Sequence, residues 1–351
     1  MSAVIVLARS GGEGQDLPLD MGSVIDGTYD NVRQEKAHGN EGYNYYASTY
    51  TNNGSYDDFE EGEHYLELSV TEENLVEKVC SEFDKVVVII NANNAMELEE
   101  LKQDDDIDAI LWVSEPGVYG FLGVADVLDG DANPSGHLPD TFAVNSTSSP
   151  AMSNFGIFHY TNYSQAEGSP LNAAAYGDFY VVEAEGIYTG YRYYETRYED
   201  AVLGRGNASG SKGATQGATW KYSDEVAYSF GYGLSYTTFS EEIVNVDRAN
   251  ETVTVKVTNT GTVPGKHVVQ LYVQTPYTQY DIQNKVEKSS IQLVAFEKTG
   301  VIQPGQSVTV EVKYDSHLFA SYDYTNLKSY FLDAGDYYFA LGNGAHDALN
   351  N

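Results

Sequence analysis

A glutamate flanked by glycines is the residue of this chain that is best placed to do chemistry. Glu13 lies in the stretch ARSGGEGQDLP, directly after the apolar residues 4–7, and residues 3–8 are predicted to form a strand. The glycines let another surface approach the backbone, and open α/β sheets bind ligands at the carboxyl ends of parallel strands. Glu13 could therefore act as a general acid or base. From these residues alone, a solvated turn glutamate is the alternative interpretation.

Signatures of phosphate and metal binding are weak. The stretch SGGEG lacks the lysine of a P-loop and the spacing of a dinucleotide fingerprint. Asp129, Asp131 and Asn133 are spaced like calcium ligands, but Pro134 stands where such a loop needs glycine. The seven histidines show no ligand spacing, so each is expected to be an ordinary surface or core residue. We expect no metal and no cofactor.

The charge balance excludes some classes of partner. Acidic residues outnumber basic ones 52 to 19, which gives a formal net charge of −33. Such a field repels nucleic acid and anionic membranes but is compatible with neutral substrates. No segment is long enough to span a membrane, and the apolar run after Met1 is too short, and lacks the basic flank, to be a signal peptide.

Strands and helices alternate in the first part of the chain. Ser69 and Glu72 form a capping box, after which Leu75, Val76, Val79 and Phe83 fall on one face of a helix. Cys80, the only cysteine, is expected to be a buried thiol. Alternation of this kind predicts parallel pairing with helices on the sheet faces. The elements expected after the capping box are a buried strand at 86–90, a helix at 95–101, a strand at 109–113 and a helix at 118–128.

The period changes in the last part of the chain. Residues 146–239 are mostly irregular, with one strong local pattern, GIYTGYRYYETRY, whose Tyr and Arg residues are expected to anchor this segment by stacking and hydrogen bonds. Beyond Phe239 apolar residues alternate with polar ones, as in Val253, Val255 and Val257. Short alternating strands separated by turns predict an antiparallel β-sandwich of roughly a hundred residues.

Five motifs occur in the order in which similar motifs run through the carboxyl-terminal part of family 3 glycoside hydrolases of the β-glucosidase type. They are SGGEGQDLP, KVVVIINANNAMEL, GVADVLDGDANPSGHLPDTF, EGIYTGYRYYET and FGYGLSYTTF. The resemblance implies α/β followed by all-β: residues 1–145 form an α/β sandwich domain without its amino-terminal part, 146–239 a linker segment packed on the domains, and 240–347 a fibronectin type III-like domain. No part of the chain resembles the family's (β/α)8 barrel.

The resemblance also implies a function. In this family the active site forms between the barrel, which carries an aspartate nucleophile, and a loop of the α/β sandwich domain, which carries a glutamate acid/base. Glu13 stands at the position that matches this glutamate. We therefore expect the carboxyl-terminal portion of a retaining β-glycosidase, inactive alone, with the barrel supplied by the same or another chain. A β-glucoside or oligosaccharide is the expected substrate, with β-xylosides and α-arabinofuranosides as open alternatives, and a secreted or cell-surface bacterial enzyme is favoured over a cytoplasmic one.

Two further interpretations stay open. Tyr43, Tyr45 and Tyr46 could offer aromatic faces to the leaving sugar, although packing within their own loop is the stronger interpretation. The chain could also be a non-catalytic carbohydrate-binding or cell-surface adhesion module. A row of exposed aromatic residues on the sandwich would favour sugar binding there, and Tyr277 and Tyr280 are candidates.

Overall fold

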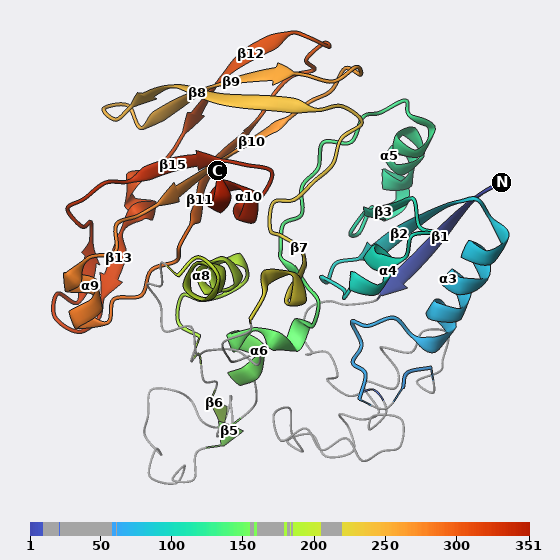
Figure 1. The fold of residues 1–351 in the computed structure, drawn as a ribbon, viewed down its shortest axis with the longest axis horizontal. Helices are drawn as coiled ribbons and strands as arrows, with labels where there is room; N and C mark the ends of the chain where they lie inside the picture. Colours follow the sequence, from blue (N-terminus) through green and yellow to red (C-terminus); the bar gives the residue numbers. More distant parts are fainter. Residues whose placement is uncertain are drawn as a thin grey trace. The chain divides into compact units, whose positions relative to one another are not determined.

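The computed structural model describes residues 1–9, 21, 58–60, 62–154, 158–159, 179–180, 183, 185–204 and 220–351. Two compact units divide the chain: residues 1–116 with 146–185, and residues 117–145 with 186–351. Figure 1 labels most of the helices and strands of both units. No helix within the described ranges combines the length and the apolar character needed to cross a membrane.

The first unit contains a three-stranded parallel sheet in the order β1-β2-β3. This confirms the parallel pairing predicted from the alternation of strands and helices. Ile5 of β1 lies opposite Val88 of β2, and Ile90 lies opposite Trp112 of β3. The elements are β1 (Ser2–Arg9), α3 (Val70–Glu82), β2 (Lys85–Ala92), α4 (Glu99–Gln103), β3 (Ala109–Trp112), α6 (Pro150–Asn154), β5 (Phe158–His159) and β6 (Phe179–Tyr180).

Burial differs between the strands of this sheet. The even residues Val86, Val88 and Ile90 of β2 are fully buried. In β1 the side chains alternate, so that Ile5 and Leu7 are buried while Val4 and Val6 remain 51% and 49% exposed. An apolar run usually marks a parallel strand covered on both faces. Among the described residues, β1 is covered on one face only.

The helix α3 confirms the predicted capping box and corrects two details. The Ser69 side chain accepts from the backbone N–H of Glu72, whose carboxylate accepts from the N–H of Ser69. Val76 is buried, but Leu75 is 44% exposed, because the helix turns Glu72 and Val76 inward instead. Cys80 is only half-buried, since it lies near the end of the helix. The next helix, expected at 95–101, begins later and is the short α4.

The second unit contains two three-stranded antiparallel sheets, in the orders β12-β9-β8 and β11-β10-β15. Their inner faces share one core around Val253, Val255, Val257 and Leu271, which confirms the predicted sandwich. The elements of this unit are α5 (Gly117–Asp129), β4 (Phe142–Ala143), α8 (Tyr191–Ala201), β7 (Val226–Tyr228), β8 (Phe239–Asp247), β9 (Thr252–Asn259), β10 (Val268–Gln274), α9 (Gln279–Asn284), β11 (Gln292–Lys298), β12 (Ser307–Lys313), β13 (Ser321–Asp323), β14 (Ser329–Phe331), β15 (Tyr338–Leu341) and α10 (Ala345–Asn350).

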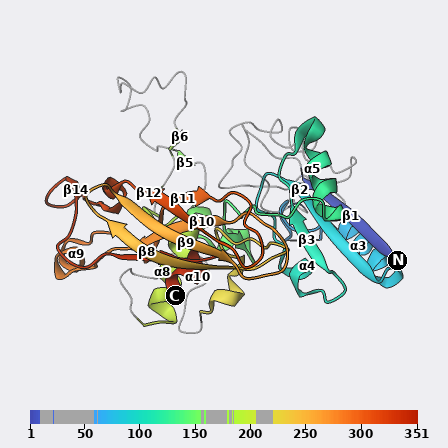
Figure 2. The ribbon, with the colours of Figure 1, turned by 90° about the horizontal axis from the view of Figure 1, so that it is seen from above.

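The tyrosine-rich pattern at 186–198 contains the helix α8, which lies beside α10 in Figures 1 and 2. Tyr191 stacks on Phe230 with ring centroids 4.4 Å apart, and its hydroxyl accepts from the backbone N–H of Leu293 at 3.1 Å. The hydroxyl of Thr196 accepts from the N–H of Ser290 at 2.9 Å. These contacts attach α8 to β11 and to the segment before it, as expected from the stacking and hydrogen-bonding side chains.

Two of the five sequence motifs pack against each other in the second unit. The Asn133 side chain accepts from the Tyr236 N–H at 2.8 Å and donates to the carbonyl of Pro264 at 3.1 Å. The backbone of Leu138 is paired with that of residues 231–232. A Cβ on Gly233 would collide with the carbonyl oxygen of Gly136. These motif residues therefore have a packing role of their own.

Candidate active-site edge of the parallel sheet

The residues that the sequence singles out for catalysis fall outside the described part of the chain. Glu13, Tyr43, Tyr45 and Tyr46 lie between residues 9 and 58, where only residue 21 is described. The structure does describe the strand from which the Glu13 loop leaves. β1 ends at Arg9, which pairs in register with Ala92 at the end of β2.

Arg9 fixes this strand end through every nitrogen of its guanidinium group. Its Nε donates to the carbonyl of Tyr65 at 3.0 Å, and Nη2 donates to the carbonyl of Glu67 at 2.7 Å. Nη1 donates to one carboxylate oxygen of Glu72, and Nη2 donates to the other. The group also lies over the rings of Phe59 and Tyr65, 5.8 and 5.5 Å from their centroids. Two-pronged pairing of this kind restricts direction as well as distance.

Glu72 serves two structural purposes at once. The same carboxylate that completes the capping box of α3 also pairs with Arg9, and the Arg9 side chain is fully buried. The start of α3 and the end of β1 are therefore joined by one buried ion pair. The capping box was predicted from the sequence, but the role of Arg9 was not. The available signal was a charged residue at the last position of an apolar strand, because a buried charge needs a partner.

The ends of the other two strands lie at the same edge. The Trp112 indole N–H donates to the carbonyl of Ala92 at 2.8 Å, which joins the ends of β3 and β2. Ser114, two residues beyond β3, has a φ of 50° and donates its hydroxyl hydrogen to Asn93. Non-glycine residues rarely adopt this left-handed conformation, which is more frequent at functional sites. Side-chain hydrogen bonds thus fix the described ends of all three strands at the carboxyl edge of the sheet.

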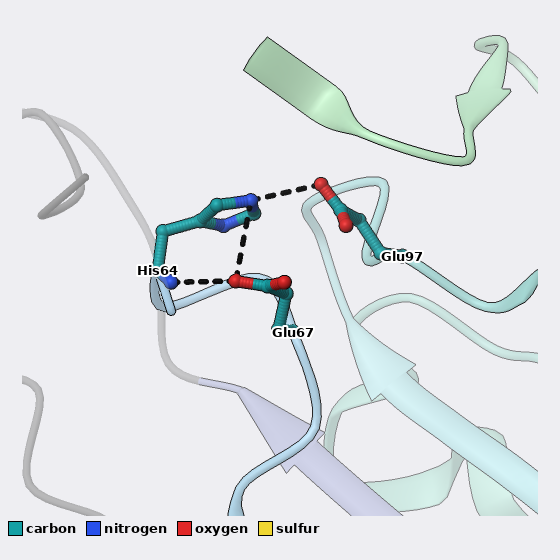
Figure 3. Close-up of side chains that lie close together, drawn as sticks. All are labelled: His64, Glu67 and Glu97. Atoms are coloured by element: carbon teal, nitrogen blue, oxygen red, sulfur yellow. Dashed lines mark hydrogen bonds and ion pairs between the residues drawn. The ribbon is translucent and has the colours of Figure 1, made fainter. Parts of the chain in front are cut away.

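His64, Glu67 and Glu97 bring three polar side chains together beside this edge, as Figure 3 shows. His64 Nε2 lies 2.8 Å from a carboxylate oxygen of Glu97 and 3.6 Å from one of Glu67. Burial by itself lowers the pKa of His64, but the carboxylates of Glu97, Glu67 and Glu63 outweigh it, and the pKa of His64 is raised. The scattered histidines of the sequence gave no sign of this cluster, although His64 and Glu67 stand three residues apart.

More acidic side chains surround the cluster. Burial raises the pKa of Glu73, and the negative charges of Glu100, Glu63 and Glu60 add to the shift. Burial likewise raises the pKa of Glu63, against a hydrogen bond from the Glu60 N–H, and the charge of Glu67 adds to it. This part of the first unit therefore carries a concentrated negative potential.

The aromatic candidates on the sandwich do not form an exposed row. Tyr277 and Tyr280 are both half-buried. Tyr280 donates to the buried carboxylate of Asp323 and packs edge-to-face on Phe331, 5.6 Å between centroids. Its phenol is thus part of the domain's own packing.

The chain is similar to two family models and to known β-glucosidases. Residues 40–236 match the glycosyl hydrolase family 3 C-terminal domain, and residues 267–345 match the fibronectin type III-like domain. β-Glucosidase A of Butyrivibrio fibrisolvens is 33% identical over 309 residues, which cover 82% of this chain and 31% of that protein. A β-glucosidase of Ruminococcus albus is 31% identical over 288 residues, 80% of this chain and 25% of that protein.

Solved structures agree with these matches. β-Glucosidase 3B from Thermotoga neapolitana, in complex with α-D-glucose, aligns with 99% of this chain and 36% of its own, at 28% identity and a TM-score of 0.60. A β-glucosidase from Paenibacillus barengoltzii aligns with 79% of this chain and 26% of its own, at 33% identity and a TM-score of 0.59. The chain thus spans about a quarter to a third of its relatives' length. Since the family match at residues 40–236 alone takes in more than half of the sequence, the chain belongs to glycosyl hydrolase family 3, as a C-terminal part joined to a fibronectin type III-like domain.

Proposed function

We propose that this chain is the carboxyl-terminal portion of a retaining β-glycosidase of the β-glucosidase type, in which Glu13 is the general acid/base. The relatives described above are β-glucosidases by name. The structural observation that carries the proposal is the end of β1. Arg9 fixes it by a buried ion pair and two carbonyl contacts, immediately before the loop that holds Glu13.

The reaction needs two carboxyl groups about 5 to 5.5 Å apart. One attacks the anomeric carbon and forms a glycosyl-enzyme bond, while the other protonates the departing glycosidic oxygen and later removes a proton from water. Glu13 has the second role. For this it must hold its proton above the ordinary carboxyl pKa of about 4.3, which exclusion of water and a neighbouring carboxylate both favour.

The nucleophile comes from a (β/α)8 barrel domain, in the same polypeptide or in another. The short span of the chain relative to its relatives supports this division. Closure against the barrel excludes water from Glu13 and completes the pair of carboxyl groups. A β-glucoside is the proposed substrate, and Tyr43, Tyr45 and Tyr46 offer aromatic faces to its leaving group.

Two assays test the proposal. The purified 351-residue chain is expected to show no turnover of an aryl β-glucoside, because it lacks the attacking carboxylate. Turnover by this chain alone, lost in Glu13→Gln but present in Glu115→Gln, would contradict the proposed division between two domains. Glu115 is a suitable control because it is an exposed glutamate in the same unit, three residues beyond β3.

The second assay uses the polypeptide that also carries the barrel. There Glu13→Gln is expected to reduce kcat/KM on glucosides with poor leaving groups by about 10²–10⁴-fold, but to spare the first step on activated aryl glucosides. In Glu13→Ala, added azide should restore turnover and yield a β-glucosyl azide, since azide attacks the glycosyl-enzyme without base assistance. Equal losses on both substrate types, with no azide product, would exclude an acid/base role.

A further inference from the structure

The cluster of His64, Glu67 and Glu97 has the composition and convergence of a metal site. One atom from each side chain, the imidazole Nε2 and two carboxylate oxygens, lies within 4.8 Å of the other two. His64 and Glu67 come from the turn that Arg9 holds, and Glu97 comes from the loop between β2 and α4. In Figure 3 the three side chains point toward one another from these separate segments.

The imidazole is the observation that sets this cluster apart from a group of surface acids. The His64 side chain is only 8% exposed, and its Nε2 makes no hydrogen bond of acceptable geometry with any described residue. Glu97 approaches this nitrogen to 2.8 Å, but out of line with the ring N–H. A buried nitrogen that faces two carboxylates without being aligned to either suits a cation placed among all three.

The spacing of the ligand atoms fits a small cation. Ligands at about 2.0–2.2 Å from a tetrahedral ion lie about 3.4 Å apart. His64 Nε2 is 3.6 Å from the Glu67 oxygen and 2.8 Å from the Glu97 oxygen, so small side-chain rotations reach that spacing. We propose that His64, Glu67 and Glu97 bind a divalent first-row transition cation, with Zn²⁺ as the best match to one imidazole and two carboxylates and a fourth position left open.

The donor set decides between classes of cation. Ca²⁺ and Mg²⁺ prefer six or more oxygen ligands, whereas imidazole suits zinc and its neighbours. The surrounding glutamates Glu60, Glu63 and Glu100 add attraction for any cation but no nitrogen ligand. In the structure, His64 Nδ1 accepts a hydrogen bond from the backbone N–H of Leu66 at 3.3 Å. An ion bound to Nε2 would place the ring proton on Nδ1, which could then no longer accept. This one long contact must therefore open when the ion binds.

A bound ion would join the turn that carries His64 and Glu67 to the β2–α4 loop that carries Glu97. Arg9 already holds the carbonyls of Tyr65 and Glu67, and the N–H of Ser146 donates to the Glu97 carboxylate. The ion would add a direct bond between the turn and the β2–α4 loop, next to the end of β1. This role is structural, and it does not depend on the proposed glycosidase function.

Calorimetry on the untagged 351-residue chain tests the site with ZnCl₂ as the probe after treatment with chelator. One Zn²⁺ per chain is expected, with a rise in the unfolding temperature. His64→Gln and Glu67→Gln should each weaken binding at least tenfold, while Glu100→Gln, which removes a nearby charge but no ligand, should weaken it less than threefold. Glu67→Gln keeps a side-chain oxygen that can accept from the backbone N–H of His64, so this variant should fold normally. Far-UV circular dichroism checks that it does.

Cobalt provides an independent readout, because Co²⁺ in a four-coordinate site absorbs visible light far more strongly than hydrated Co²⁺. Intense bands in the wild-type chain that are absent in His64→Gln would support the site. Weak binding of several ions per chain, unchanged in His64→Gln and Glu67→Gln, would overturn it and leave only general attraction to an acidic surface. Tighter binding of Ca²⁺ than of Zn²⁺ would overturn the assigned class of cation.

Discussion

At the scale of single residues, Arg9 matters most for the proposed site. Its guanidinium is fully buried, and the pair with Glu72 joins the last residue of β1 to the first turn of α3. A buried ion pair adds little net stability when formed, but removal of one partner leaves an uncompensated charge in the interior. The position of the end of β1, the strand that precedes the Glu13 loop in the sequence, therefore depends on both partners being present.

We predict that Arg9→Met destabilises the first unit by about 3–5 kcal/mol, and that Arg9→Met/Glu72→Met recovers part of this loss because no buried charge is left alone. The chain has two tryptophans, of which Trp112 lies in the first unit and Trp220 in the second. Denaturant unfolding in a Trp220→Phe background thus reports the first unit. Lys78→Met, which removes an exposed ion pair with Glu82, should leave the midpoint unchanged. Additive losses in the double variant would contradict this account.

His137 should make the second unit sensitive to acid. Burial and the neighbouring His267 and Lys298 lower the pKa of His137 to about 4, against a hydrogen bond with Asn343. The folded pKa lies below the ordinary 6.5, so the stabilisation is complete above pH 6.5 and is lost as the pH falls toward 4. Because the ring is partly exposed, we expect a loss of about 1–2 kcal/mol. Unfolding followed by Trp220 in a Trp112→Phe background, at pH 7 and 4.5, measures it.

The controls for this prediction are two substitutions. His137→Gln should remove most of the difference between pH 7 and 4.5, whereas His317→Gln should retain it, since the His317 side chain is 94% exposed. An unchanged pH dependence in His137→Gln would assign the acid sensitivity to other groups. The Asp323 carboxyl, whose pKa is lowered to about 2 mainly by the Tyr280 hydroxyl, loses its charge only at lower pH.

At the scale of elements, close backbone approach joins the two motifs of the second unit. Gly233 lies so near residues 136–137 that an added Cβ would collide with the Gly136 carbonyl oxygen and come within 3.0 Å of the His137 ring. We predict that Gly233→Ala destabilises this unit by about 1–3 kcal/mol, because the backbone must move to make room. Gly300→Ala, where the added atom meets nothing within 4 Å, is the matched control. Equal unfolding midpoints for the two variants, followed by Trp220, would refute the close approach.

The sequence predicted those elements whose side chains follow a simple period. The strands around Val88 and Val255 and the capping box of Ser69 were found because apolar runs, alternation and capping have local causes. The helix α8 was not predicted, because its buried residues are tyrosines, Thr196 and charged residues such as Glu195 rather than a stripe of aliphatic side chains. The partners of Arg9, and Glu97 as a partner of His64, were also beyond the sequence. They lie on segments far along the chain, and only the fold brings them together.

At the scale of the whole molecule, apolar side chains remain uncovered on α5 and on β1 within the described residues. None of the 13 residues of α5 is buried, although many of them are apolar. Val118, Tyr119 and Leu122 are 89%, 79% and 68% exposed. On β1, Val4 and Val6 are half exposed. A helix that is apolar but not packed gains little stability in water, because most helical stability in proteins comes from burial of one face.

We therefore predict that α5 exchanges its amide hydrogens much faster than α3 in the 351-residue chain. The two helices have equal lengths of 13 residues, but α3 has a capping box and a buried Val76, and α5 has neither a buried residue nor an acidic first turn. Hydrogen exchange measured by mass spectrometry on peptides from both helices gives the comparison within one sample. In the polypeptide that also carries the barrel, α5 should become protected to the level of α3, because its apolar residues are then covered. Slow exchange of α5 in the 351-residue chain would mean that residues of this chain already cover the helix. The apolar residues of α5 would then give no reason to expect a partner domain there.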